Sequence, residues 1–255
     1  MSAAVGRYYD LAKRQEWRAN ELPWNDLPPI PETSGAPERR ARRRDLWRSV
    51  ITQQLQAELL AVAMAGQLLE LARHPEARLY YTTMVQDEAR HVECWARLAR
   101  EVGGTSVRDP HLDKMAHFQL NLETLEEKVF GMQVWFERII IPRFRLIARA
   151  TGGTVLAELC NRLTIDDGIH HSSGVAYERV LLEGAPTAVK QTLARGLDFI
   201  LPVFVDHLLW RPPERAWLGA SMENRDRVRA RAEIEEGFRI ASSLGVDVGE
   251  VRMPL

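Results

Sequence analysis

Cysteine, strand-forming runs and long apolar stretches are all scarce in this sequence. Its 255 residues include only two cysteines, Cys94 and Cys160, so no disulfide framework is expected and a reducing compartment is indicated. Alternating β-branched runs do not occur, which argues against a β-sheet. The most apolar stretch, residues 55–71, contains two glutamates and is shorter than the roughly 20 apolar residues that a membrane helix needs.

Net charge is also nearly absent. Lysine and arginine total 34 and aspartate and glutamate total 35, a formal charge of −1. Neither nucleic acid nor an anionic membrane is therefore expected as a partner. The N-terminus has no apolar signal core, so we expect a cytoplasmic protein. Five arginines lie between residues 39 and 44; a solvated helix start is one interpretation, and a surface for a phosphate-bearing carrier or an electron-donor protein is the other.

Helical signals fill most of the chain. Proline at first-turn positions and glycine at ends bracket expected helices at about 38–73, 76–102, 112–150, 154–182, 186–210 and 223–244. A short helical piece near residues 8–17 and a Pro-rich stretch precede them. The sequence therefore predicts an all-α fold. Residues 1–37 would form an N-terminal arm and residues 38–255 a single helical domain.

Two carboxylate–histidine pairs stand out within these helices, and a lone glutamate precedes each. The pairs are Glu88-x-x-His91 and Asp167-x-x-His170, and Glu58 and Glu137 come 30 residues before the first member of each pair. Residues three apart project from one side of a helix, so each pair can reach one ion. This order predicts two metal ions held between four helices. Oxygen-rich ligation with one imidazole per ion favours iron or manganese over structural zinc.

The proposed ligands share helical stripes with apolar residues. Leu55 and Val62 flank Glu58, Met84 and Trp95 flank the second helix pair, and Leu163 precedes Asp167. An ionised carboxylate on such a buried stripe is costly unless it is paired or bound to metal. The alternative to a metal site is a set of buried salt bridges, such as Glu88 with Arg90 or Glu137 with Arg138. Asp166 and His171 leave a one-residue ambiguity at the second pair, and the Leu163 stripe favours Asp167 and His170.

The motif resembles that of the ferritin-like superfamily of di-iron carboxylate proteins, more narrowly the branch of oxidases and oxygenases similar to ribonucleotide reductase small subunits. The resemblance covers about residues 44–177, and the N-terminal YYDLAKRQEWRANELPW is similar to the lead-in segment of that branch. It implies a ferritin-like four-helix bundle at about 38–182 with additional N- and C-terminal helices, those at the C-terminus at about 186–244. It implies six ligands: Glu58, Glu88, His91, Glu137, Asp167 and His170.

Two residues depart from the family pattern and bear on the expected activity. Asp167 stands where these families usually have glutamate, so its carboxylate reaches less far. Trp95 lies four residues after His91, where radical-generating subunits have a tyrosine. This tryptophan is a candidate for a redox-active or pocket-lining residue, although a purely structural role in the core is the competing interpretation. Pro142 predicts a kink or π-bulge just beyond Glu137, and Gln54 is expected either to contact Glu58 or to face solvent.

These features predict an O2-dependent oxidase or oxygenase that holds two iron ions, or one manganese and one iron, and acts on a small organic substrate. O2 would be the co-substrate, an electron-donor protein is a candidate partner, and a homodimer is expected from the resemblance. A ferroxidase or iron-handling protein is the first alternative. A non-catalytic helical interaction protein is the second, and the retention of ligand-capable side chains at all six positions disfavours it.

Overall fold

The computed structural model describes residues 3–32, 35–104, 109–204 and 224–249. Over these residues it contains helices and no strands, as the sequence predicts. The elements are α1 (Ala3–Gln15), η1 (Ala19–Glu21), α2 (Pro37–Leu71), α3 (Pro75–Val102), α4 (Pro110–Leu120), α5 (Leu125–Lys128), η2 (Val129–Phe136), α6 (Glu137–Ala150), α7 (Val155–Leu181), α8 (Thr187–Phe204) and α10 (Asn224–Ser243). The predicted end of the fifth long helix, near residue 210, lies outside the described residues.

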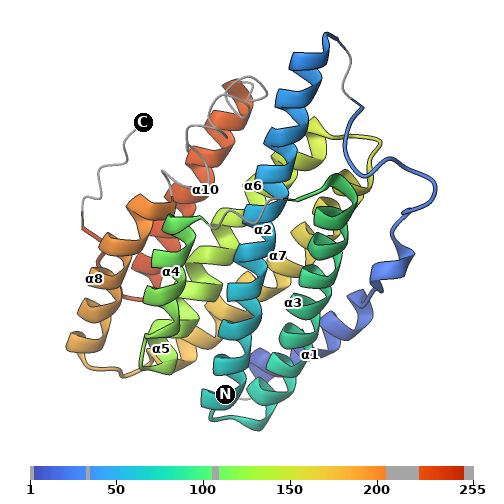
Figure 1. Ribbon diagram of the computed structural model, residues 1–255. Helices are drawn as coiled ribbons and strands as arrows, with labels where there is room; N and C mark the ends of the chain where they lie inside the picture. The colour runs from blue at the N-terminus through green and yellow to red at the C-terminus, as the bar shows by residue number, and fades with distance from the viewer. Residues whose placement is uncertain (1–2, 33–34, 105–108, 205–223, 250–255) are drawn as a thin grey trace.

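Four long segments form the central bundle (Figure 1). Helix α2 packs along α3, and the continuous segment from η2 to α6 packs along α7. Helix α1 lies against α3 and α7, while α8 contacts η2 and α10 contacts α6. One buried hydrophobic cluster runs through all of these elements, from Val5 to Val248. The residues of the N-terminal arm therefore contribute to the same core as the bundle.

Helix ends follow the local signals in the sequence. Pro37 and Pro75 occupy first-turn positions of α2 and α3, where their missing N–H groups cost nothing. Gly103 ends α3 in the left-handed conformation with φ of 70°. At the start of α7, the backbone N–H groups of residues 155 and 156 donate to the carbonyls of Pro28 and Pro29 at 3.0 and 3.3 Å. The Pro-rich segment thus satisfies two of the free donors at this helix end.

The third predicted helix is divided differently from the prediction. Helix α4 ends at Leu120, and a capping box between Thr124 and Glu127 starts the next helical segment. Gly131 lies inside η2, which is a π-helix. The π-helix comes directly before Glu137, whereas the prediction placed a bulge beyond it. Helix α6 is α-helical from Glu137 to Ala150 with Pro142 inside it, so the prediction of a π-bulge beyond Glu137 is wrong.

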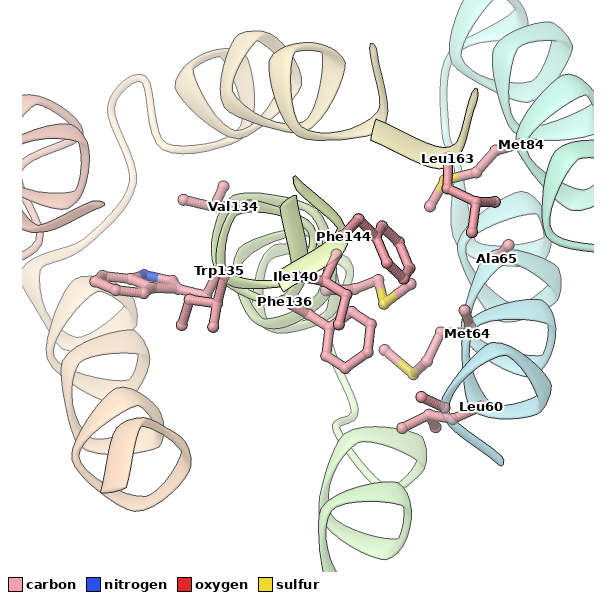
Figure 2. Packing of buried hydrophobic residues seen from close by; sticks show 14 of the residues in the cluster. Leu60, Met64, Ala65, Met84, Val134, Trp135, Phe136, Ile140, Phe144 and Leu163 are labelled. Carbon is pink, nitrogen blue, oxygen red and sulfur yellow. The ribbon is translucent and has the colours of Figure 1, made fainter. Parts of the chain in front are cut away.

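Large apolar side chains fill the space between α6 and α2. In Figure 2, Phe136, Ile140 and Phe144 point from the η2–α6 segment toward Met64 and Leu60 of α2. All five are at most 6% exposed, and full burial of each such side chain stabilises the fold by roughly 1.5–3 kcal/mol. This packing fixes the rotation of the η2–α6 segment and therefore the direction in which Glu137 projects.

Helix α7 lies very close to η2 at Gly174. A Cβ atom at this position would overlap the Cβ of Gln133, which cannot move without shifting the π-helix. We expect Gly174→Ala to lower the free energy of unfolding of the metal-free protein by about 1–3 kcal/mol through overpacking. Urea unfolding followed by circular dichroism measures this change.

A matched control is available on the same helix. A Cβ at Gly168 would have no other atom within 4 Å, so Gly168→Ala is expected to raise the free energy of unfolding by about 0.5–1 kcal/mol through helix propensity. Equal effects of the two substitutions would contradict the close approach at Gly174.

Candidate metal centre

The six predicted ligands come from four helical elements and are all buried. Glu58 projects from α2, Glu88 and His91 from α3, Glu137 from the start of α6, and Asp167 and His170 from α7. None is more than 5% exposed. Six ionisable groups in the interior of one bundle demand compensation, because an isolated buried charge is very unfavourable.

Five of these residues form two overlapping groups whose ligand-capable atoms lie within 4.8 Å of one another. One group is Glu58, Glu88 and His91, and the other is Glu88, Glu137 and His170. Glu88 belongs to both: its carboxylate oxygens lie 3.3 Å from Nδ1 of His91 and 3.2 Å from Nδ1 of His170. One carboxylate thus stands between two histidines, in the position that a ligand bridging two ions would take.

Glu58 and Glu137, the remaining glutamates, each lie beside one of the two histidines, which gives the cluster two half-sites. Glu58 Oε2 lies 3.5 Å from Nδ1 of His91, and Glu137 Oε1 lies 3.5 Å from Nδ1 of His170. Asp167 is farther from the nearest imidazole, with Oδ1 at 3.9 Å from Nδ1 of His170, and it stands outside both groups. This longer separation agrees with its shorter side chain.

Each histidine also contacts an aspartate through Nε2, its outer ring nitrogen. Nε2 of His91 lies 3.1 Å from Asp166, and Nε2 of His170 lies 3.3 Å from Asp87. The Arg90 guanidinium donates to both aspartates, and Trp17 Nε1 donates to Asp166 at 2.8 Å. A carboxylate on the outer nitrogen fixes the ring orientation and leaves Nδ1 free to face the interior of the cluster.

Sequence reasoning missed Asp87, Arg90 and Trp17 as parts of this site. One signal was present: an aspartate directly precedes both members of the repeat, as Asp87-Glu88 and Asp166-Asp167. Successive residues on a helix point in different directions. One acidic residue of such a doublet can therefore face Nδ1 of a histidine while its neighbour contacts Nε2 of a histidine. The contact from Trp17 joins residues 149 apart, and no local pattern indicates it.

The structure separates Asp166 and His171 from the cluster. Asp166 lies on the outer side of His91, whereas Nδ1 of His171 is 3.0 Å from the Gln133 carbonyl and its Nε2 is 3.3 Å from Arg138. The salt bridges considered as the alternative to a metal site are not formed as predicted. Arg90 pairs with Asp87 and Asp166, and Arg138 pairs with Glu233.

Burial and crowding of like charges raise the pKa values of three carboxyl groups. Burial raises the pKa of Glu58, and burial together with the charge of Glu88 raises the pKa of Glu137 to about 7. Burial and the neighbouring Glu137 raise the pKa of Asp167 well above its usual value. Burial acts in the same direction on Glu88, but the two adjacent histidines outweigh it and lower the Glu88 pKa.

The histidines carry the compensating charge in the metal-free protein. Burial lowers the pKa of His91, but the carboxylates of Asp166, Glu58 and Glu88 outweigh it and raise that pKa well above the usual value. The pKa of His170 is likewise raised, although burial opposes the shift. In the metal-free protein the protons on these two histidines offset the charge of the carboxylates. Metal ions would take over that role, and their binding would release the protons.

Unsatisfied atoms in the cluster fit a metal as well. Four buried ligand-capable atoms take part in ion pairs at 3.2–3.5 Å but make no hydrogen bond of good geometry among the described residues: Glu88 Oε1, His91 Nδ1, Glu137 Oε1 and His170 Nδ1. Buried polar atoms without partners are rare in folded proteins. All four lie on the inner side of the cluster, where carboxylate oxygen and imidazole nitrogen are ligands that suit iron and manganese.

Trp95 and Gln54, the two other residues singled out in the sequence, are both buried. Trp95 is fully buried and stacks on Phe144 with a ring-centroid separation of 6.2 Å, and its Nε1 has no acceptor among the described residues. Gln54 is buried, and its Nε2 donates to Glu58 Oε1 at 3.1 Å. Gln54 therefore contacts Glu58 and does not face solvent.

The fold is that of the R2-like, ferritin-like helical proteins. The chain is similar to an R2-like ligand-binding oxidase variant with an anaerobically reconstituted Mn/Fe cofactor, with 17% identity over 96% of this chain and 94% of that chain and a TM-score of 0.68. A second variant with an aerobically reconstituted Mn/Fe cofactor gives 17% identity, the same coverage and a TM-score of 0.69. This likeness establishes the architecture predicted from the ligand motif.

A third structure in this group is an R2-like ligand-binding oxidase variant with a non-activated Mn/Mn cofactor. It is 18% identical over 96% of this chain and 93% of that chain, with a TM-score of 0.66. No protein-family model and no curated protein matches the sequence. Within the described part of the chain, no helix has the length and apolar character needed to cross a membrane.

Proposed function

We propose that this protein is a dinuclear-metal oxidase or oxygenase that uses O2 to oxidise a small organic substrate. The observation that carries the proposal is the shared position of Glu88 between His91 and His170, with a further glutamate beside each histidine. Two equivalent half-sites joined by one carboxylate suit two ions and not one. The Mn/Fe cofactors of the structural neighbours point in the same direction.

In this proposal the ligands are Glu58, Glu88, His91, Glu137, Asp167 and His170, and the ions are two irons or one manganese and one iron. When bound, such ions supply the electrons that reduce O2. Asp166 and Asp87 hold the two imidazoles so that Nδ1 faces the ions, and Arg90 keeps both aspartates in place. Phe144 and Trp95 are buried and stack on each other.

A ferroxidase or iron-handling activity is the principal alternative. It requires the same ligands, but α8, α10 and the N-terminal arm add helices beyond the four of the ligand-bearing bundle. Such additions suit a substrate pocket or a subunit contact better than a storage shell. With excess Fe²⁺ and O2, mineral formation would favour storage. A single stoichiometric reaction with oxidation of a bound organic molecule would favour the oxidase.

The wider setting follows from the same proposal. A small organic molecule would be the substrate, an electron-donor protein would return the ions to the reduced state, and the protein would act in the cytoplasm as a homodimer. The exposed arginines near residues 39–44 at the start of α2 suit an acidic protein surface on the electron donor.

We expect the protein purified from iron- or manganese-supplemented cells to contain about two ions per chain, because the two half-sites are equivalent. Adding O2 to the anaerobic ferrous form should change the visible absorption spectrum, and His91→Ala or Glu137→Ala should abolish that change. Elemental analysis and stopped-flow spectroscopy measure the two quantities. A protein that stays metal-free after supplementation, or zinc bound through Cys94 or Cys160, would contradict the proposal.

A further inference from the structure

Gln133 of the π-helix joins three of the segments that contribute proposed metal ligands. Its side chain is fully buried. The hydroxyl of Tyr81 on α3 donates to Gln133 Oε1 at 2.7 Å. On α7, Gln133 Nε2 donates to the backbone carbonyl of His170 at 3.0 Å and to Ser173 Oγ at 3.1 Å. Gln133 itself precedes the ligand Glu137 in the continuous η2–α6 segment.

The partners of Gln133 allow its amide only one orientation. A backbone carbonyl can only accept a hydrogen bond, so the NH2 group of the amide must face His170. Oε1 of the amide therefore faces the Tyr81 hydroxyl, which is its donor. Ser173 Oγ also donates to the His170 carbonyl, at 2.9 Å. Two side chains thus hold the peptide group of this histidine.

The register of the π-helix gives the main chain of Gln133 a contact with α7 as well. The Glu137 N–H donates to the Met132 carbonyl, whereas in an α-helix it would donate to the carbonyl of Gln133. Nδ1 of His171 lies 3.0 Å from that Gln133 carbonyl. Gly174 permits the close approach, because a Cβ atom there would overlap the Gln133 side chain. The side chain and the main chain of one residue therefore both attach the π-helix to α7.

The two half-sites, named here by their histidines, differ in their contact with Gln133. Within the described part of the chain, the side-chain hydrogen bonds of Gln133 go to Tyr81 and to α7. His91 is held instead through Asp166, which accepts from Arg90. The His91 half-site thus has its own support, and the π-helix supports the His170 half-site.

We propose that Gln133 is a positioning residue that sets the place of His170, so that the metal affinity of the His170 half-site alone depends on it. This inference rests on the dinuclear metal site proposed above. Nδ1 of His170 lies 3.2 Å from Glu88 and 3.5 Å from Glu137, and a shift of the His170 backbone would change both separations. Groups that orient a metal ligand typically contribute about 10- to 100-fold to metal affinity.

Gln133→Met tests the role of the amide, because methionine has a similar length but no N–H donor. The affinity of the His170 half-site for Mn²⁺ should fall by about 10- to 100-fold. The affinity of the His91 half-site should stay within about twofold, as for independent sites. Titration with Mn²⁺, followed by electron paramagnetic resonance of the free ion, measures both affinities.

Single-site backgrounds assign the effect to one half-site. His91→Ala keeps only the histidine of the His170 half-site, and His170→Ala keeps only that of the His91 half-site. Adding Gln133→Met should weaken Mn²⁺ binding in the first background and leave it unchanged in the second. A general loss of stability would weaken binding in both backgrounds, and circular dichroism establishes that each variant is folded.

Two further variants complete the comparison. Tyr81→Phe keeps the ring but removes one hydrogen bond of the Gln133 amide, so it should weaken the same half-site by about 2- to 10-fold even if Gln133→Met does not fold. Gln119→Met is the matched control. Gln119 is 1% exposed and lies against Gly131 of the same π-helix, but its amide makes no hydrogen bond of good geometry among the described residues. This control should leave both half-sites unchanged.

A measurement on metal-free protein separates this inference from the proposed function. In NMR spectra of protein with isotopically labelled histidine, Gln133→Met should shift the imidazole resonances of His170 and leave those of His91 in place. An unmodified protein that binds no ion would refute the metal site, and the resonances would still test the positioning of His170. Equal weakening of both half-sites, unchanged affinity of the His170 half-site, or unmoved His170 resonances would overturn the inference.

Discussion

Replacing Glu88 with alanine is expected to remove both metal ions from each chain, whereas loss of a ligand that serves one half-site should leave a partly occupied site. The reason is geometric: Glu88 oxygens lie 3.3 Å from the His91 Nδ1 and 3.2 Å from the His170 Nδ1. Without this carboxylate each half-site keeps only one glutamate beside its histidine, and two divalent ions would lose the charge between them. Elemental analysis after supplementation and desalting measures the metal content.

Glu93 offers a matched control on the same helix. It is exposed on α3, so Glu93→Ala removes the same side chain without touching the cluster and should retain about two ions per chain. Glu88→Gln keeps the side-chain shape and tests the charge alone. Circular dichroism establishes that each variant is folded. Retention of one full equivalent of metal in folded Glu88→Ala would show that Glu88 serves one ion only.

The adjacent residues Asp166 and Asp167 are expected to respond to substitution in opposite ways in the metal-free protein. Burial raises the pKa of Asp166, but His91, Arg90 and Trp17 outweigh it and lower that pKa. Its charged form therefore stabilises the fold. Asp166→Ala leaves Arg90 with one partner fewer and should cost about 3–5 kcal/mol at pH 7, as for other broken buried ion pairs.

Asp167 has the opposite balance. Burial and Glu137 raise its pKa well above the usual value, so its charged form destabilises the metal-free fold. Asp167→Asn should therefore leave the free energy of unfolding within about 1 kcal/mol of the original or raise it, while weakening metal binding. Equal destabilisation by both substitutions would contradict the separate roles of these neighbours.

The pH dependence of the Asp166 effect has a defined sign. A carboxyl group with a lowered folded-state pKa contributes stability above its unfolded value, here 3.8, and loses it as the pH falls through the folded value. The difference in stability between the original protein and Asp166→Ala should thus be full at neutral pH and shrink below about pH 4. Urea unfolding at several pH values measures it, with Asp167→Asn for comparison.

The helices and the inner side of the metal cluster could be predicted from the sequence because both depend on short-range spacing. Pro37, Pro75 and Gly103 mark helix ends through their own backbone geometry. The repeated carboxylate–histidine pairs place both half-sites on buried stripes, and five of the six predicted ligands meet within the two groups. Their role as metal ligands stays a prediction.

Features that depend on packing between distant segments were not predictable in the same way. The π-helix η2, from Val129 to Phe136, packs against Gly174 of α7. No residue within η2 indicates from the sequence that its hydrogen bonds follow the π rather than the α pattern. Pro142 did not indicate the position of the π-helix, which lies before Glu137 and not beyond it. The contact of Trp17 with Asp166 needs the bundle to be assembled before either residue has a partner.

That contact also sets an order of events during synthesis. Trp17 is among the first residues to leave the ribosome, but its acceptor Asp166 follows 149 positions later. Until α7 has emerged, neither histidine–aspartate contact can form, and the arm has no carboxylate to hold. Closing such a long loop is slow relative to helix formation. More than two-thirds of the 255 residues must therefore be made before both proposed half-sites are complete, and loading of two ions becomes a late step in maturation.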